Sequence, residues 1–244
     1  REASLDDPHP YLTEVLKKAQ EISEHSNGAF DVTVQPLWKL YSAAEQEGRV
    51  PDESEIQSAS QKVDWRKVSF TDSGIRIDEG MSLTLNGIAQ GFASDRALAV
   101  IRDRGIRHAL VDTGEIGALG RKPGKETWTV GIQHPRQKDA YLDLTKIEDL
   151  CMATSGDYST TFSPDRAYTH IFDPATGRSP EALSSVTVLA PSGIDADGIS
   201  TTVFVLGEVA GLRLLQSYPG TEAMVVKKNG EALYTDGFPR SGAG

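Results

Sequence analysis

Apolar residues recur at intervals of three and four positions in several parts of the chain, which is the spacing of one helix face. The first such stretch spans residues 11–25 and ends at Asn27-Gly28; its apolar positions are Leu12, Val15, Leu16, Ala19 and Ile22. A second helical stretch is predicted after Pro36, and a short helix after Pro51, where proline and acidic residues suit the first helical turn. A further helix is predicted over residues 196–207. The strongest prediction covers residues 87–106, with Gly105 past the helix end. Its predicted apolar side is made of Ala93, Ala97, Val100 and Ile101.

Alternating apolar and polar residues predict the strands. Residues 29–34 predict a short strand before Pro36, and residues 108–120 predict one buried strand ending in glycines. Two hairpins are predicted, one turning at Asp72-Ser73-Gly74 and one around Asn229-Gly230. Further predicted strands lie in residues 127–135, 140–147, 149–160 and 184–191. Because strands and helices are interspersed without regular βαβ alternation, we predict an α+β fold formed as one domain over residues 1–244.

Charge and composition exclude several functions. The chain has 25 Lys and Arg against 35 Asp and Glu among its 244 residues, and a net charge of -10 argues against a nucleic-acid surface. No run approaches about 18 to 20 consecutive apolar residues, so we expect no membrane span. The single Cys151 excludes an internal disulfide and a multi-cysteine zinc site, and low cysteine use fits cytoplasm or periplasm.

The chain begins without methionine, at REASLDDPHP, and carries no charged and apolar leader pattern there. We interpret it as a processed or truncated product whose targeting information lies outside the sequence.

The predicted helix after residue 196 carries two oxygen donors one turn apart. The four-residue step from Asp197 to Thr201 places a carboxylate and a hydroxyl on one helix face. Such a pair suits Mg²⁺, which takes one or two carboxylates together with water and substrate phosphate. The structural alternative is that Asp197 caps the helix and Thr201 bonds back to a carbonyl group.

His170 precedes an Asp-Pro turn and a Thr-Gly pair, so we expect it on a loop near a strand end. An imidazole there can act as a general base or can simply hold the loop. Ser155 lacks the G-x-S-x-G context of a hydrolase nucleophile. Glu115 can accept hydrogen bonds from a ligand or cap a turn. Aromatic residues that can stack on a flat ring, or belong to the core, are Phe30, Trp38, Tyr41 and Phe92.

Seven motifs, in order, resemble those of the ApbE family, the FAD:protein FMN transferases. They are NGAFDVTVQPLW, NGIAQGFASDR, VDTGEIGALG, WTVGIQHP, ATSGDY, HIFDPATG and DADGISTTVFVLG, from about Asn27 to Gly207. The resemblance implies a T-fold-like α+β architecture with mixed and antiparallel sheets and packed helices. It also implies Mg²⁺-dependent transfer of FMN from FAD to a Ser or Thr hydroxyl of a target protein, with release of AMP.

The resemblance also implies roles for individual residues. The metal ligands would be the backbone carbonyl of Gly87 and the side chains of Asp197 and Thr201, with Ser200 nearby. His170 would take the proton of the target hydroxyl, as a catalytic base. The FAD contacts would be Ala29, Phe30, Asp31, Thr84, Gln90 and Phe172.

The sequence departs from the family pattern in two ways. Where the family often has Asp before the glycine turn and Lys after it, this chain has Thr84 and Gln90. The paired loss of one charge of each sign either leaves the local electrostatics balanced or marks a subgroup with altered FAD affinity. The family's N-terminal segment, with an early strand and further flavin contacts, is also missing from the sequence.

Three functions remain open at this level. The first is FMN transfer to a subunit of a membrane-associated electron-transfer complex, in the periplasm, with inner-membrane association through the missing N-terminal segment as one arrangement. The second is FAD hydrolysis to FMN and AMP, with water as the acceptor. The third is a flavin-binding assembly protein without turnover.

Overall fold

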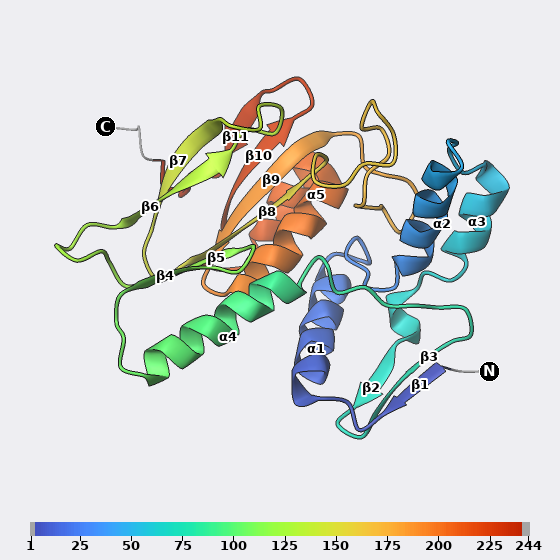
Figure 1. The fold of residues 1–244 in the computed structure, drawn as a ribbon, viewed down its shortest axis with the longest axis horizontal. Coiled ribbons are helices and arrows are strands. Elements are labelled where there is room, and N and C mark those ends of the chain that lie inside the picture. The colour runs from blue at the N-terminus through green and yellow to red at the C-terminus, as the bar shows by residue number, and fades with distance from the viewer. Residues whose placement is uncertain (1–2, 241–244) are drawn as a thin grey trace.

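The computed structural model describes residues 3–240 (Figure 1). Its largest sheet has six antiparallel strands. The strands lie in the order β11-β10-β9-β8-β5-β4. Their bounds are β4 Ala109–Asp112, β5 Ile116–Leu119, β8 Cys151–Gly156, β9 Leu183–Ala190, β10 Glu222–Lys227 and β11 Ala232–Tyr234. The fold is therefore α+β with antiparallel sheets, as predicted from the sequence.

Different elements cover the two faces of this sheet. Helices α4 (Ala89–Asp103) and α5 (Gly193–Leu215) lie on one face, and the hairpin of β6 (Trp128–Gln133) and β7 (Tyr141–Ile147) packs on the other. Successive side chains of strand β9 point to opposite faces of the sheet, so β9 contributes to the core on both faces. Val186 and Val188 pack with α5, whereas Leu189 packs with the hairpin, and all three are fully buried.

The N-terminal elements form a second group beside the sheet, drawn at the right of Figure 1. They are β1 (Ala3–Asp6), α1 (Pro10–His25), α2 (Gln35–Gln46), α3 (Glu53–Ser60), the 3₁₀ helix η1 (Trp65–Lys67), β2 (Ser69–Thr71) and β3 (Gly74–Ile77). The strands pair in the order β1-β3-β2. The predicted hairpin at 67–78 is thus confirmed, and β1 adds an edge strand that the sequence pattern did not predict.

Helices α4 and α5 cap each other where they cross. Asp95 of α4 accepts hydrogen bonds from the first backbone N–H groups of α5, at 2.6 Å from Gly193 and 2.9 Å from Ile194. In return, Oδ2 of Asp197 in α5 accepts the N–H of Gly91 in the first turn of α4, at 2.9 Å. A Cβ on Gly91 would lie 2.0 Å from the Gly193 carbonyl oxygen. Glycine is therefore required at this crossing because only bare backbones approach so closely.

The segment 29–34 is not the strand that its alternation predicted. It forms turns, because the Asp31 carboxylate accepts hydrogen bonds from the Thr33 N–H (2.7 Å), the Thr33 hydroxyl (2.6 Å) and the Trp65 N–H (3.0 Å). This side chain satisfies backbone donors that a strand would direct to a neighbouring strand. The helix predicted after it is confirmed as α2.

Residues 108–120 form the hairpin β4–β5 instead of one buried strand. The chain turns at Thr113-Gly114-Glu115, where Thr113 N–H donates to the Glu115 carbonyl and Gly114 has a φ of 101°. Glycine permits this left-handed conformation, and the turn projects Glu115 away from the strand line.

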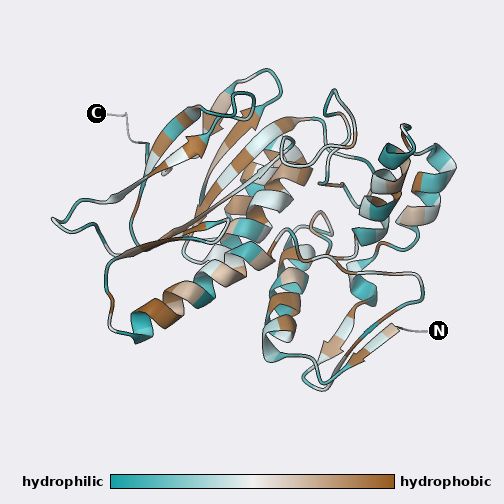
Figure 2. Cartoon of the chain, viewed as in Figure 1, coloured by the Kyte–Doolittle hydropathy of each residue, from teal (hydrophilic) through white to brown (hydrophobic). Residues whose placement is uncertain are grey.

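The predicted apolar side of α4 is largely wrong. The buried residues of the helix are Gly91, Phe92, Ser94 and Leu98, none of which was predicted, whereas Ala93 is exposed and Val100 is 57% exposed. Of the predicted residues, Ile101 packs against the core but is only partly buried. The contact of Gly91 with Gly193 sets which side of α4 faces α5. Figure 2 shows the hydrophobic C-terminal end of α4 that this orientation leaves outside.

Helix α5 meets the length and composition of a membrane span, although its sequence contains no long unbroken apolar run. In the structure 56% of its most apolar window is buried, and Ile199, Val203 and Phe204 are fully buried in the core of the sheet. Its apolar composition is accounted for by this packing.

Candidate active site

One cavity of about 450 Å³ lies where the N-terminal elements meet the sheet. Its size is within the usual range of small-molecule sites, roughly 300 to 1,000 Å³. Every residue assigned a site role from the sequence lines it: Ala29, Phe30, Asp31, Thr84, Gly87, Gln90, His170, Phe172, Asp197 and Thr201. The first and last of these residues, Ala29 and Thr201, are 172 positions apart in the chain, and the fold brings their motifs together at one cavity.

His170 stands on the loop that follows β8, as expected, and its ring is held in one orientation. The backbone N–H and Nδ1 of His170 each lie 3.1 Å from the carbonyl oxygen of Thr160. A carbonyl oxygen can only accept, so Nδ1 carries the proton and Nε2 keeps its lone pair. Burial lowers the pKa of His170, outweighing the opposing effect of the Thr160 hydrogen bond. The ring is therefore neutral near pH 7 and can accept a proton at Nε2.

The proposed metal ligands converge on one wall of the cavity. A Cβ on Gly87 would lie 3.0 Å from the Thr201 hydroxyl oxygen, which places the Gly87 backbone directly against Thr201. Asp197 lies one turn before Thr201 on α5 and is 4% exposed. The carboxylate is therefore buried in the cavity wall and not open to bulk solvent.

The sequence also allowed purely structural roles for Asp197, as a helix cap, and for Thr201, as a donor to a helix carbonyl. The structure bears out only part of this alternative. Asp197 does cap a helix, but the helix is α4 and not its own. The hydroxyls of α5 that bond back to carbonyl groups belong to Ser200 and Thr202. Thr201 Oγ1 instead lies 3.1 Å from Ser155 Oγ, across the cavity wall. Thr201 thus remains directed toward the cavity.

The donor set fits Mg²⁺ better than a softer metal. Among residues 3–240 no group of three or more His, Cys, Asp or Glu side chains could hold a metal ion. A carboxylate, a hydroxyl and a backbone carbonyl are hard oxygen donors, and Mg²⁺ commonly completes such a partial set with water and substrate phosphate. Burial raises the pKa of Asp197 to about 7, so a cation beside it would favour the charged carboxylate.

Glu115, for which the sequence left a ligand contact or a turn cap open, lines the cavity. Its Oε2 accepts the N–H of Thr154 in β8 at 3.2 Å, so the hydrogen bond of the carboxylate goes to the neighbouring strand and not to the β4–β5 turn in which Glu115 sits. Burial, and secondly the charge of Asp197, raise its pKa to about 8. The ligand contact stays a prediction.

Ser155, which lacks the sequence context of a hydrolase nucleophile, lies in the cavity wall. Its hydroxyl lies 2.8 Å from Ser200 Oγ, so it links the end of β8 to α5 beside Thr201. Other cavity residues without an earlier assignment are Asn86, Thr154, Gly156 and Ser159. The ATSGDY motif was the available signal for this wall.

The aromatic candidates divide into two groups. Phe30 and Trp38 line the cavity with Phe172, whereas Tyr41 and Phe92 do not. Tyr41 is 1% exposed and packs on the Phe172 ring at a centroid distance of 5.0 Å. Only the first group can contact a flat ligand in the cavity.

Thr84 and Gln90 flank the glycine turn on the cavity wall. The backbone N–H of Thr84 donates to the Val32 carbonyl at 2.8 Å, which ties the two entry segments together. Both side chains are uncharged, and the acidic residues of the cavity lining are Asp31, Glu115 and Asp197.

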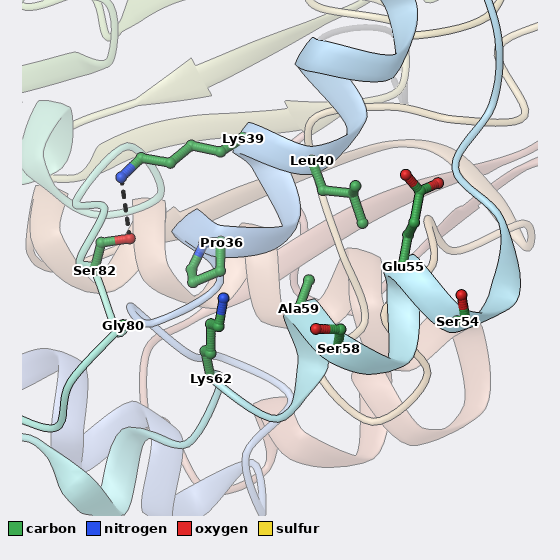
Figure 3. Close-up of a pocket in the computed structure, with 10 residues that line it drawn as sticks. All are labelled: Pro36, Lys39, Leu40, Ser54, Glu55, Ser58, Ala59, Lys62, Gly80 and Ser82. Carbon is green, nitrogen blue, oxygen red and sulfur yellow. Dashed lines mark hydrogen bonds between the residues drawn. The ribbon is translucent and has the colours of Figure 1, made fainter.

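A second groove, of about 550 Å³, lies between α2, α3 and the segment 80–82 (Figure 3). None of the predicted site residues lines it. Lys39 and Lys62 extend across it, with Lys39 Nζ 3.4 Å from Ser82 Oγ. The candidate chemistry is confined to the first cavity.

Comparison with known proteins identifies the family. A family model described as the ApbE family matches residues 3–225. The chain belongs to the ApbE family.

Two relatives are named FAD:protein FMN transferase. The one from Treponema pallidum is 32% identical and aligns with 88% of this chain and 65% of its own length. The one from Salmonella typhimurium is 28% identical and aligns with 92% of this chain and 67% of its own length. This chain thus spans about two thirds of these ApbE-family relatives.

Solved ApbE structures show the same fold. The ApbE protein of Thermotoga maritima has a TM-score of 0.86 and 30% identity, with 95% of this chain and 77% of that chain covered. The apo form of the Pseudomonas stutzeri flavinyl transferase ApbE has a TM-score of 0.81 and 30% identity, over 96% and 74% of the two chains. The predicted ApbE architecture is therefore confirmed.

Proposed function

We propose that this protein transfers FMN from FAD to a Ser or Thr hydroxyl of a target protein and releases AMP, in a Mg²⁺-dependent reaction. The observation that carries the proposal is the convergence of a neutral His170, an oxygen-donor wall and cavity aromatics in one space. The name shared by the relatives, FAD:protein FMN transferase, supports the same reaction.

The chain's residues have distinct parts in this reaction. Nε2 of His170 takes the proton of the acceptor hydroxyl while the oxygen attacks the FMN phosphorus, because an alcohol is a weak nucleophile until a base assists it. The bond between that phosphorus and the bridging oxygen breaks, and AMP leaves with the bridging oxygen. Phe30, Trp38 and Phe172 exclude water from one side of the cavity and offer ring faces to the flavin.

Gly87, Asp197 and Thr201 would hold the metal. Bound there, Mg²⁺ would neutralise the pyrophosphate and stabilise the charge on departing AMP. Glu115 and Asp197 together make the cavity anionic at alkaline pH, so FAD phosphates would bind poorly without a cation.

The decisive experiment mixes the protein with FAD, Mg²⁺ and a candidate acceptor bearing an accessible Ser or Thr, and measures acceptor mass and AMP. A mass gain of one FMN with matching AMP supports transfer. FMN and AMP without a mass gain would replace transfer by FAD hydrolysis. Bound FAD with neither product would leave a binding role.

As the acceptor we propose a redox subunit of a membrane-associated electron-transfer complex, matured in the periplasm. The support is the family's reaction alone, since the relatives' names specify only a protein acceptor. Mass spectrometry of flavin-bearing peptides from cells with and without the gene would identify the acceptor and its compartment.

A further inference from the structure

The carboxylate of Asp157 is the most completely buried charge beside the cavity, with an exposed fraction of 0%. It is held by two cations from different hairpins. Arg136, in the β6–β7 connection, donates from Nη1 to Oδ1 at 2.6 Å and from Nη2 to Oδ2 at 2.7 Å. Lys228, just after β10, donates from Nζ to Oδ2. Two-point guanidinium binding fixes both the position and the plane of the carboxylate.

Asp157 begins the turn that leads to the His170 contact. It follows Gly156, the last residue of β8, and its own N–H donates to the Ser184 carbonyl at 3.1 Å. Three residues later, the Thr160 carbonyl accepts both N–H groups of His170. The turn 157–160 is therefore fixed at its start by the ion cluster and at its end by the histidine, and Ser159 between them lines the cavity.

We propose that Asp157 is a positioning residue for His170: by anchoring the turn 157–160, it holds the Thr160 carbonyl where it keeps the proton on Nδ1 and leaves Nε2 unprotonated. The inference rests on the proposed function, in which His170 is the base. A ring without this acceptor can protonate either nitrogen, and the Nε2–H form cannot accept a proton from the acceptor hydroxyl.

The charges around Asp157 favour the ionised form of its carboxylate. Burial alone would raise its pKa, but the N–H groups of Arg136 and Lys228 outweigh burial and hold the pKa below its ordinary value. The carboxylate is thus ionised near pH 7, where the proposed reaction would run.

The test compares Asp157→Asn with Glu148→Gln. The control variant removes a half-buried carboxylate that Arg121 contacts at 2.6 Å and that is not part of the cavity lining. The first readout is ¹⁵N NMR of the histidine rings, with the His170 signals assigned by their loss in His170→Gln. We expect wild type and Glu148→Gln to show one Nδ1–H tautomer, and folded Asp157→Asn to show a mixture.

The second readout is FMN transfer with FAD titrated. Asp157→Asn should lower kcat by about 10- to 100-fold, the usual effect of losing a group that orients a reactive ligand, with the KM for FAD little changed. An unchanged His170 tautomer in folded Asp157→Asn would overturn the proposal, as would an effect confined to KM. If Asp157→Asn does not fold, Arg136→Lys should keep the tautomer and Arg136→Met should lose it; equal behaviour of the two would also overturn the proposal.

The NMR and transfer measurements test the role of Asp157 and the proposed function separately. A wild-type protein that releases no FMN to any acceptor would contradict the transferase assignment. The NMR comparison would still decide whether Asp157 sets the tautomer of His170.

Discussion

At the scale of single residues, the state of His170 determines the pH dependence of the proposed reaction. Burial lowers its pKa, so the neutral ring persists below its ordinary value of 6.5. At saturating Mg²⁺, which favours the charged form of Asp197, transfer should then be constant through pH 7 and fall as the pH drops through the lowered pKa of His170. His170→Gln should slow transfer by roughly 10² to 10⁴, the usual range for general acid-base catalysis, and remove this acid limb.

The measurement is the pH profile of single-turnover FMN transfer at saturating FAD, with FAD affinity measured in parallel. A loss confined to FAD affinity would make His170 a binding residue.

Asp197 offers a second test at this scale. Asp197→Asn keeps the shape of the side chain and an oxygen for the Gly91 N–H, so the variant should fold. Loss of the charged ligand should reduce Mg²⁺-dependent AMP release by at least about 10³-fold, because Lewis-acid assistance is worth several kcal/mol. Asp195→Asn, two residues earlier on α5 and paired with Lys18 at 3.2 Å, is the control and should retain activity. Comparable loss in both variants would contradict the ligand role.

The sequence predicted which residues lie together better than it predicted their environments. Motif order placed His170, Asp197 and Thr201 in one site, and the fold brings them into one cavity. It did not show that Asp197 would be buried or that Glu115 would acquire a pKa of about 8. Desolvation depends on what packs around a group, and residue spacing carries no information about that packing.

At the scale of elements, the crossing of α4 and α5 controls the geometry of the cavity wall that carries Gly87, Asp197 and Thr201. Gly91→Ala would place a Cβ 2.0 Å from the Gly193 carbonyl oxygen and 2.7 Å from Cβ of Asp197. The clashing atoms belong to the backbone of Gly193 and cannot rotate away as a side chain can, so α4 and α5 must move apart. We expect a loss of about 1 to 3 kcal/mol in the free energy of unfolding, together with reduced activity.

Gly198→Ala is the matched control for this crossing. It also adds a methyl group to a helical glycine, but the first contact is the flexible end of Ile22, at 2.4 Å. Urea unfolding of both variants should show the larger loss for Gly91→Ala. The reverse order would mean that the helix crossing tolerates expansion.

Elements with a strong local pattern were predictable, and elements decided by distant contacts were not. The periodicity of residues 11–25 predicted α1 because its buried residues supply that periodicity themselves. Residues 29–34 have strand-like alternation, but the hydrogen bonds of Asp31 to Thr33 and Trp65 replace strand pairing. Strand β1 is exposed at all four positions and exists through its pairing with β3, so no apolar pattern marks it.

At the scale of the whole molecule, the cavity joins the N-terminal elements to the sheet. Phe30, Trp38 and Thr84 come from the N-terminal side, and Ser155, His170 and Asp197 come from β8, its following loop and α5. A ligand that fills the cavity therefore contacts both parts of the chain. Binding should restrain them together.

This arrangement predicts a specific stabilisation by FAD with Mg²⁺. At a free FAD concentration 100 times its Kd, mass action adds about 2.7 kcal/mol to the free energy of unfolding. For a chain of this size that corresponds to a rise in Tm of roughly 5 to 10 °C. Hydrogen exchange should slow both in residues 29–38 and in residues 154–160. In Asp197→Asn the Mg²⁺-dependent part of both effects should disappear. Protection of only one segment would show that FAD binds one side of the cavity without linking the two parts, and the transfer geometry proposed here would then be wrong.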